Sequence, residues 1–570
     1  MLLRINTVQR LVASSRWVLG LVLTCAAAGA IAQAPNRITA PTQVEAVRAF
    51  ERLQPWVRGF AVPDDAAADE FAGACVTLHW RGRVIGRGEA IGLGTATLPD
   101  ATRLALDEAR AALMPLPRPD ADEALALRAG EIAISLELAG TPVPVEVGTY
   151  SELTATLSPG IDAIAVRIGD AGDVVFPLEM LRTRQQAGSA ASRLVGALTG
   201  DAMLGLRQPA ELAPAGVGFF RLATVAVAQQ TPGGAAVPLL RGGRLVLLAD
   251  TDARAIRDQA RSTLGWLLRH AETGVYLPSN DSVLREADAT QQAMVAFAIA
   301  RAVGSPHRAR WPSDDARPVA IHIVQGLADR ASLPPAAAAL GFAASELLGR
   351  PDLGASLREH LLIGVPDDRQ RAIAAWGMAV AGESERAREL IAELRSVEHA
   401  GQLIVHMPWL GWTEQILAGD GAIPNAVGLR EMRRLIAGFQ LTPADAGPEN
   451  ADLVGGIVFT SGPVPLPTWQ SARPAAFLAS MLRDPRLTEP TEVGDRLVDH
   501  AGLVRFLMQL AATQTEGHLY RDPASAAGGI RAATWDHSMP IEASALTLIT
   551  LLETLDSLAE LQADPPGPAD

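Results

Sequence analysis

The chain has 570 residues, of which 48% are apolar and 20% are charged, and its formal net charge is −14 at pH 7. This length exceeds what one hydrophobic core organises, so we expect two or three domains. The acidic balance argues against nucleic acid and anionic membranes as partners. All 49 basic residues are arginine, which excludes Schiff-base catalysis by lysine.

Residues 1–32 have the pattern of a secretory signal peptide. Three arginines accompany a short apolar stretch, and the small residues at 30–32 offer a cleavage site before Gln33. The stretch is shorter than the roughly 20 residues that a membrane-spanning helix needs. Lipid attachment at Cys25 is disfavoured, because Thr24 is a poor residue before a modified cysteine. We expect a periplasmic or extracellular protein without membrane insertion after cleavage, although retention of the segment as an anchor stays open.

The N-terminal half mixes helices and strands without a repeat. A leader at 33–44 is followed by a helix near 41–57, a hairpin near 74–92 and a helix near 99–116. A strand near 131–140 comes next, and then a short helix and two strands separated by an Asp-Ala-Gly-Asp turn. This order predicts an α+β domain. Cys75, the only cysteine after cleavage, has apolar neighbours that predict a buried thiol without a disulfide.

Three segments in this half carry a family resemblance: "ACVTLHWRGRVIGRGEAIG", "EIAISLELAGTPVPVEV" and "LSPGIDAIAVRIGDAGDVVFPLEML". Together they resemble the AMMECR-type domain, an α+β family, over about residues 45–205. The resemblance implies a fold but no activity, since that family has no well-established one. Where the family has Arg-Gly-Cys-Ile-Gly, this chain has "GRGEAIG", so any role of that cysteine is absent. We expect Arg87 and Glu89 to be part of a solvated hairpin rather than a polar site.

Residues 206–253 contain two strand patterns, near 217–230 and 242–250, and are expected to form a β linker or a small sheet joining two domains. From residue 254 to 563 the pattern is almost wholly helical, and residues 564–570 are expected to be a disordered tail. The expected helices lie near 254–270, 285–303, 316–331, 334–348, 352–363, 367–381, 384–397, 401–418, 426–438, 470–483, 497–514 and 540–562. Paired as αα-hairpins, these helices bury their apolar faces only by stacking around an axis.

That pattern resembles the α/α-toroid (six-hairpin) class. The phrases that carry it are "GWLLRHAETGVYLPSNDSVLREADATQQAMVAFAIARA", "GGIVFTSGPVPLPTWQSARPAAFLASML" and "GGIRAATWDHSMPIEASALTLITLLETL". The class includes glycosidases, polysaccharide lyases, sugar epimerases, terpene cyclases and non-catalytic relatives, so the resemblance implies a fold rather than a reaction.

Candidate site residues gather in three loops that precede helices. A sugar site needs aromatic faces for stacking and two carboxylates for acid–base or nucleophilic work. The catalytic candidates are Asp536, Glu542, Glu286 and Asp288. The ligand-binding candidates are Trp535, Arg531, His537, Trp412 and Tyr520. Structural roles compete with this reading, since Asp536 and His537 could cap the final helix and an acidic residue suits any helix start.

Other chemistries lack their motifs: the chain has no Gly-x-Ser-x-Gly, no His-Glu-x-x-His and no phosphate-binding glycine loop. The ten histidines are scattered, so neither a metal site nor a cofactor is indicated. Two hypotheses follow. The first is binding or processing of an oligosaccharide or cell-envelope ligand at the toroid mouth, as a hydrolase, lyase or epimerase if it is an enzyme. The second is a non-catalytic envelope scaffold or protein-binding module, in which the candidate carboxylates would be dispersed.

Overall fold

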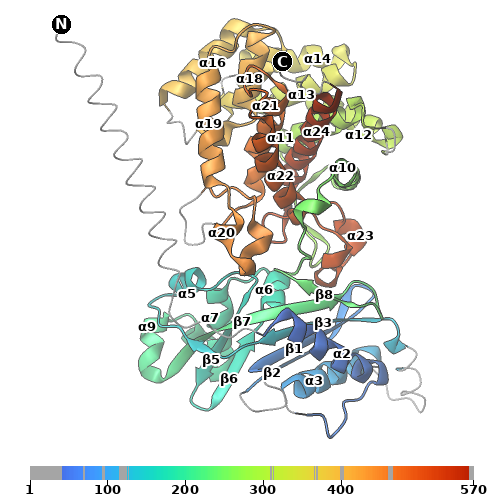
Figure 1. Ribbon diagram of the computed structural model, residues 1–570, viewed down its shortest axis with the longest axis vertical. Helices are drawn as coiled ribbons and strands as arrows, with labels where there is room; N and C mark the ends of the chain where they lie inside the picture. The colour runs from blue at the N-terminus through green and yellow to red at the C-terminus, as the bar shows by residue number, and fades with distance from the viewer. Residues whose placement is uncertain are drawn as a thin grey trace, which may run out of the picture.

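The computed structural model describes residues 41–563, apart from 68–70, 93–96, 115–124, 126–127, 309–310, 312, 365, 368–369, 398–402 and 460–465. The expected signal peptide, most of the leader and the C-terminal tail lie outside these residues. A sheet-containing domain and a helical domain are stacked along the long axis of the molecule (Figure 1). The predicted combination of an α+β domain with an all-α domain is therefore confirmed.

The N-terminal domain is built on one antiparallel sheet. Its strands are β1 (Gly73–Trp80), β2 (Arg83–Ile91), β3 (Ile132–Ala139), β4 (Val143–Pro144), β5 (Asp162–Ile168), β6 (Ala171–Val175), β7 (Val217–Gln229) and β8 (Ala236–Leu239). Their order is β2-β1-β3-β7-β5-β6, and β4 and β8 both pair with β7. The helices are α2 (Gln43–Gly59), α3 (Thr97–Leu113), α5 (Tyr150–Thr156), α6 (Pro177–Thr183), α7 (Ala187–Thr199), α8 (Ala202–Gly205) and α9 (Pro209–Leu212).

Packing divides this domain into two halves. Helices α2 and α3 cover the β1–β3 half, where Phe50, Leu53 and Leu98 are fully buried. Helices α5 and α7 pack at the β5–β6 half around Leu153 and Val195. Because apolar residues of strand and helix face each other across the sheet, the domain has a core of its own.

Residues 206–253 are not a separate linker or small sheet: the strand expected near 217–230 is present as β7, but it belongs to the sheet of the N-terminal domain. Strand β7 lies between β3 and β5 and joins the two halves of the sheet. The second strand expected in this segment, at 242–250, is not present. That segment begins at Gly242, whose φ of 77° turns the chain, and Leu247 and Leu248 are then left half exposed. The strand that pairs with the end of β7 is β8.

The C-terminal domain contains the twelve expected helices within the described residues, with ends shifted by a few positions except at the helix expected from 401, which begins at Trp409. They are α10 (Ala253–Arg269), α11 (Ala289–Gly304), α12 (Ser313–Ala328), α13 (Pro335–Leu347), α14 (Pro351–Ile363), α15 (Arg371–Val380), α16 (Ser384–Val397), α18 (Trp409–Ala418), α19 (Ala426–Phe439), α21 (Ala472–Arg483), α22 (Val493–Leu510) and α24 (Ile541–Ala563). Short helices α20 (Pro443–Ala446) and α23 (Pro523–Ala526) and a sheet of β9 (Thr273–Leu277), β10 (Ser282–Glu286) and β11 (Met539–Pro540) occupy the connections.

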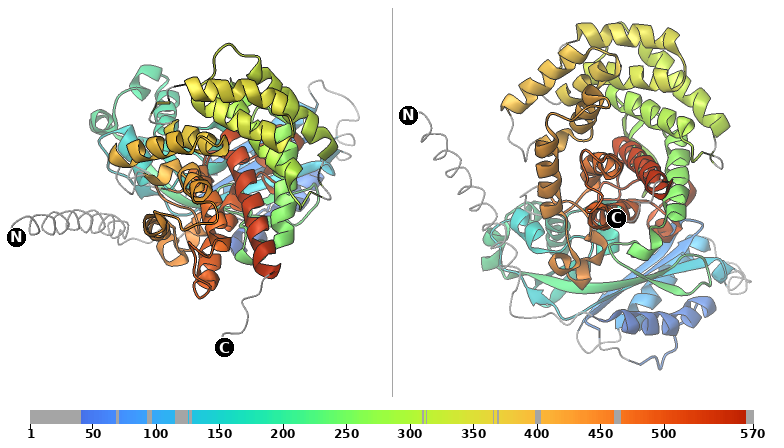
Figure 2. Two further views of the ribbon diagram at one scale, coloured as in Figure 1. Left: turned by 90° about the horizontal axis from the view of Figure 1, so that it is seen from above. Right: turned by 45° about the horizontal axis from the view of Figure 1, so that its top comes forward.

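Contacts between helices close these hairpins into an α/α toroid. Helices α11, α13, α15, α18, α21 and α24 each pack on the next, and α24 packs back on α11. The helix that precedes each of them lies outside this ring, as Figure 2 shows for the arc from α12 to α19. The sequence of an inner helix explains its place: α13 is apolar around its whole circumference and is almost entirely buried.

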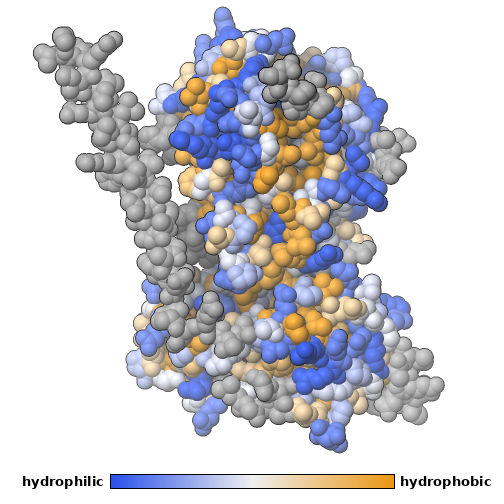
Figure 3. Space-filling view, viewed as in Figure 1, coloured by the Kyte–Doolittle hydropathy of each residue, from blue (hydrophilic) through white to orange (hydrophobic). Residues whose placement is uncertain are grey.

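The two domains meet at a polar, buried junction. Arg241, in the turn after β8, forms a 2.5 Å ion pair with Asp452 of the toroid domain, and both side chains are inaccessible to solvent. Its Nε donates to Pro159 O in the sheet domain at 2.9 Å. Arg505 of α22 donates to Val246 O at 2.6 Å. In the view of Figure 3, apolar side chains gather over the middle of the molecule, next to this junction.

Candidate functional site

A cavity of about 740 Å³ opens between the C-terminal halves of the inner helices, at the end of the toroid away from the sheet domain. We call it the toroid cavity. Every inner helix contributes lining residues, among them Arg301 of α11, Glu346 of α13, Trp376 of α15, Trp412 of α18 and Glu553 of α24. A cavity on the axis of a toroid is a usual place for a ligand site between helices.

Aromatic rings form one wall of the toroid cavity. Phe297 packs edge-to-face on Trp376 with ring centroids 5.1 Å apart, and Trp376 lies 6.3 Å from Trp412. Trp409 supports both tryptophans from behind, at 4.8 Å and 5.5 Å. Because these side chains are largely buried among one another, the ring surfaces at the cavity are held in place before any ligand arrives.

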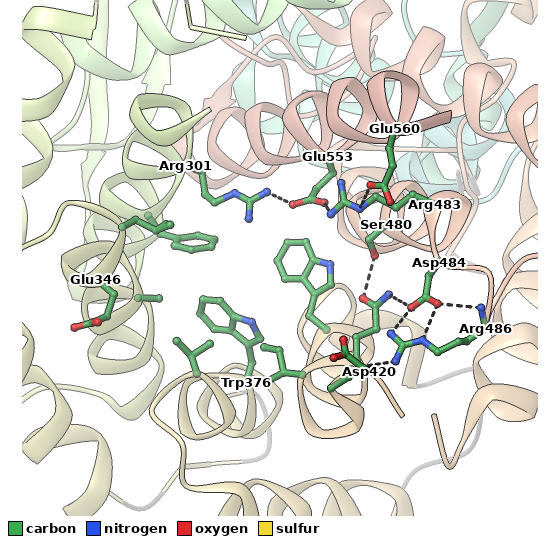
Figure 4. A pocket seen from close by; sticks show the side chains of 18 of the residues that line it. Arg301, Glu346, Trp376, Asp420, Ser480, Arg483, Asp484, Arg486, Glu553 and Glu560 are labelled. Atoms are coloured by element: carbon green, nitrogen blue, oxygen red, sulfur yellow. Dashed lines mark hydrogen bonds and ion pairs between the residues drawn. The ribbon is translucent and has the colours of Figure 1, made fainter. Parts of the chain in front are cut away.

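A charged network faces the aromatic wall. Glu553 is only 2% exposed, and its carboxylate accepts hydrogen bonds from Arg301 and, at 2.8 Å, from Arg483. Figure 4 shows both guanidinium groups directed at this carboxylate beside the indole rings. Asp556, one turn further along α24, lies 3.7 Å from Arg301. The two arginines are thus neutralised by carboxylates of a single helix.

A second polar cluster shapes the rim. Arg486 donates to both carboxylate oxygens of Asp484, at 2.8 Å and 2.7 Å, and to Gly421 O at 2.8 Å. Gln415 donates to Asp484 at 3.1 Å and accepts from Ser480 at 3.3 Å. Burial alone would raise the pKa of Asp484, but these hydrogen bonds outweigh it and lower the pKa below its usual range.

The predicted catalytic carboxylates lie at the other end of the toroid, and they do not all meet in one cavity. Glu286 is exposed at the end of β10, and Asp288 caps α11, accepting from Gln291 N at 2.9 Å. Glu542 is partly buried in the first turn of α24. Burial raises its pKa, Arg473 opposes this, and the nearby charge of Asp288 raises it further. Asp288 and Glu542 are therefore neighbours.

Three candidates of the last loop, residues 520–540, lie in the interior next to the domain junction, where His537 Nε2 is 3.3 Å from Arg241 O. Arg531 is fully buried and donates to Leu510 O at 3.2 Å, and its guanidinium lies 3.1 Å from His537 Nε2. Tyr520 packs edge-on against His537 with centroids 5.8 Å apart. Burial lowers the pKa of His537 well below its ordinary value, and the charge of Arg531 adds to this effect. These three candidates are interior residues of the junction.

Trp535 and Asp536 differ from the rest of that loop. Both line a second cavity, of about 240 Å³, whose other walls come from the sheet domain. We call it the interdomain cavity. Asp536 does not cap the final helix, since its carboxylate accepts from Ser538 N at 3.0 Å. Of the nine candidate residues, Trp412 alone is among those that line the toroid cavity.

Residues 86–92 also differ from expectation. Arg87 is not solvated: its side chain is 18% exposed and pairs with Glu89 and, at 2.7 Å, with Glu179. Glu137 lies in the same cluster, fully buried on β3, and accepts from Leu178 N at 2.9 Å. Burial raises the pKa of Glu89 to about 7, Arg87 opposes this shift, and the remaining carboxylates favour it. The hairpin therefore contributes to a polar cluster inside the sheet domain.

The loop motifs of the sequence do not indicate the toroid cavity, because its walls come mainly from the inner helices. Several of its polar residues, such as Arg301 and Glu553, lie inside helices, where the signal in the sequence is a charge within an apolar run, as for Glu553 in "ALTLITLLETL". Among the described residues, no group of His, Cys, Asp and Glu is arranged to hold a metal ion. Nor does the described part of the chain contain a helix with the length and apolarity needed to cross a membrane.

Comparisons with known proteins give little further information. No family model and no curated protein matches the chain. Among solved structures, it is similar to one titled "Crystal Structure of Uncharacterized Protein PH0010 From Pyrococcus horikoshii", with 14% identity and a TM-score of 0.25. That match covers 34% of this chain and 94% of the other.

Proposed function

We propose that the protein binds carbohydrate in the toroid cavity. The observation that carries this proposal is the pairing, in one open cavity, of a tryptophan wall with a fixed array of charged and amide side chains. Sugars present both an apolar ring face and a rim of hydroxyl groups. Trp376 and Trp412 suit the face, whereas Glu553, Gln415 and Asp484 suit the hydroxyls.

The charge balance favours an uncharged sugar. Arg301 and Arg483 are already paired with Glu553, and Arg486 is paired with Asp484. A sugar acid would have to compete with these carboxylates for the guanidinium groups. The hydroxyls of a neutral sugar can instead add hydrogen bonds to paired groups without separating them.

The proposal extends to the location and the sheet domain. A periplasmic or extracellular protein is supported by the signal-peptide pattern of residues 1–32. We further propose, from the resemblance of the N-terminal segments, that the sheet domain has the AMMECR-type fold, which leaves its ligand open. A carbohydrate-binding toroid in the cell envelope is consistent with both.

A thermal-shift screen of the purified protein with uncharged oligosaccharides tests the binding. A ligand at 100 times its dissociation constant should stabilise the protein by about 2.7 kcal/mol. Trp412→Leu should abolish that shift, because it removes one side of the aromatic wall. Trp469→Leu is the matched control: Trp469 is 8% exposed compared with 9% for Trp412, but it does not line the cavity. A shift that survives Trp412→Leu, or the absence of any shift, would contradict the proposal.

A further inference from the structure

The walls of the interdomain cavity come from both domains. The sheet domain supplies the end of α5, the turn at 158–160, and the residues between α6 and α7, including Arg184 and Gln185. The toroid domain supplies Trp535 and Asp536 from the last loop. It shares no lining residue with the toroid cavity, so the two can be tested separately.

Two opposite charges in this cavity form only a long, partly exposed ion pair. Arg184 Nε lies 3.8 Å from Asp536 Oδ1, and each side chain is 38% exposed. At this separation and exposure an ion pair contributes little to stability. Within the described residues the guanidinium group of Arg184 makes no hydrogen bond, and the one that the Asp536 carboxylate accepts, from Ser538 N, uses Oδ1. Both groups therefore retain capacity for a ligand.

The backbone at Arg184 indicates that its side chain has a use. Arg184 is the C-cap of α6, with φ 57° and ψ 32°, in the left-handed region. Glycine is the usual residue at such a helix end, because a side chain there costs about 1 kcal/mol. The long pair with Asp536 does not repay that cost in the fold. A function for the guanidinium in the cavity would account for it.

The remaining walls add an aromatic face and an unmet acceptor. Trp535 is partly exposed and lines the cavity beside Asp536. Gln185 Oε1 is a buried oxygen that accepts no hydrogen bond from the described residues. A buried carbonyl oxygen without a donor costs roughly 1–3 kcal/mol, so a donor brought by a ligand would be favourable there.

We propose that the interdomain cavity binds a free α-amino acid in its zwitterionic form. The ligand carboxylate accepts hydrogen bonds from Arg184, and its ammonium group donates to Asp536 and Gln185. Its side chain lies against Trp535. The ligand then adds two close ion pairs to the long one between Arg184 and Asp536: its carboxylate pairs with Arg184, and its ammonium group pairs with Asp536. A neutral sugar could use Trp535 but would bring no opposite charge to Arg184 or Asp536, whose own ion pair is long.

Isothermal titration calorimetry on the full protein tests this, with each of the common L-amino acids as a separate probe. At least one should give saturable binding. The amide of that amino acid lacks the carboxylate, and the N-acetyl form lacks the ammonium charge. Each should bind at least 10-fold more weakly than the parent. Absence of binding by every amino acid, or equal binding of the parent and both derivatives, would overturn the proposal.

Two variants locate the binding in this cavity. Arg184→Gly should weaken binding at least 10-fold while leaving the melting temperature unchanged or higher, because glycine relieves the left-handed backbone. Asp536→Asn should weaken the binding of the parent amino acid more than the binding of its N-acetyl form. Arg254→Ala, which removes an exposed arginine that does not line the cavity, is the control and should bind normally. Undiminished binding in both cavity variants would place the ligand elsewhere and refute the assignment.

Discussion

At the scale of single residues, the clearest feature is a buried carboxyl group in the sheet domain. Glu137 is 1% exposed on β3, and burial raises its pKa to about 8. The hydrogen bond from Leu178 N and the charge of Arg87 oppose this shift, whereas Glu89 and Glu179 strengthen it. Since the pKa in the unfolded chain is near 4.5, the folded state holds a proton between these values that the unfolded state releases.

We predict that Glu137→Gln makes the protein less sensitive to alkaline pH. Glu137 contributes stability below pH 4.5 that is lost as the pH rises towards about 8. Glutamine is neutral throughout and keeps an oxygen for Leu178 N. The variant should therefore gain roughly 1–3 kcal/mol over the wild type at pH 8, and less at pH 5, in urea unfolding. Glu131→Gln, at a half-exposed site, is the control. An equal difference at both pH values would contradict the assignment.

At the scale of elements, β2 and α3 pack with backbone against backbone. Gly86 and Gly88 point to the same side of β2, and they face Ala101, Ala105 and Ala109, which repeat every four residues along α3. A Cβ atom at Gly88 would lie 1.9 Å from Ala101 O. The "GRGEAIG" stretch therefore needs glycine at these positions because the helix lies directly on the strand.

Gly88→Ala should destabilise the sheet domain by roughly 3 kcal/mol, since α3 must move away from the sheet to admit the methyl group. Gly59→Ala is the matched control in the same domain, because a Cβ there meets nothing within 4 Å. It should change stability by less than about 0.5 kcal/mol. Urea unfolding followed by circular dichroism measures both, and similar midpoints for the two variants would show that the close approach is not required.

At the scale of the whole molecule, Arg241 connects the domains. It reaches Pro159 on one side and Asp452 on the other, with no access to solvent. Breaking a buried ion pair leaves an uncompensated charge, which costs about 3–5 kcal/mol, whereas replacing both partners by apolar residues is often tolerated.

Asp452→Leu should therefore lower the stability of the domain junction by about 3 kcal/mol or more, and the double variant Arg241→Met with Asp452→Leu should recover much of that loss. The first urea transition of the full chain measures the effect. The exposed pair Arg254–Asp258 supplies the control, and its disruption should cost less than about 1 kcal/mol. Additive losses in the double variant would show that Arg241 and Asp452 are not energetically coupled.

The sequence by itself determined the local structure. The apolar periodicity predicted the helices of the toroid, and alternation predicted β1–β3, because both patterns depend on residues close together in the chain. Pairing with distant segments carries no such signal. The sequence therefore predicts a strand near 217–230 but not its place in the sheet, since its neighbours β3 and β5 come from segments at least 49 positions earlier.

The candidate site was decided by tertiary structure. Closure of the ring brings Arg301 to Glu553 across 252 positions of the chain and Arg483 to the same carboxylate across 70. In the sequence these residues are isolated charges within apolar helices. The last loop shows the same limit, since Arg531 is interior while Trp535, four positions later, lines a cavity completed by the other domain. Local patterns determine which residues form a helix or strand, but burial and the approach of distant elements determine which side chains meet.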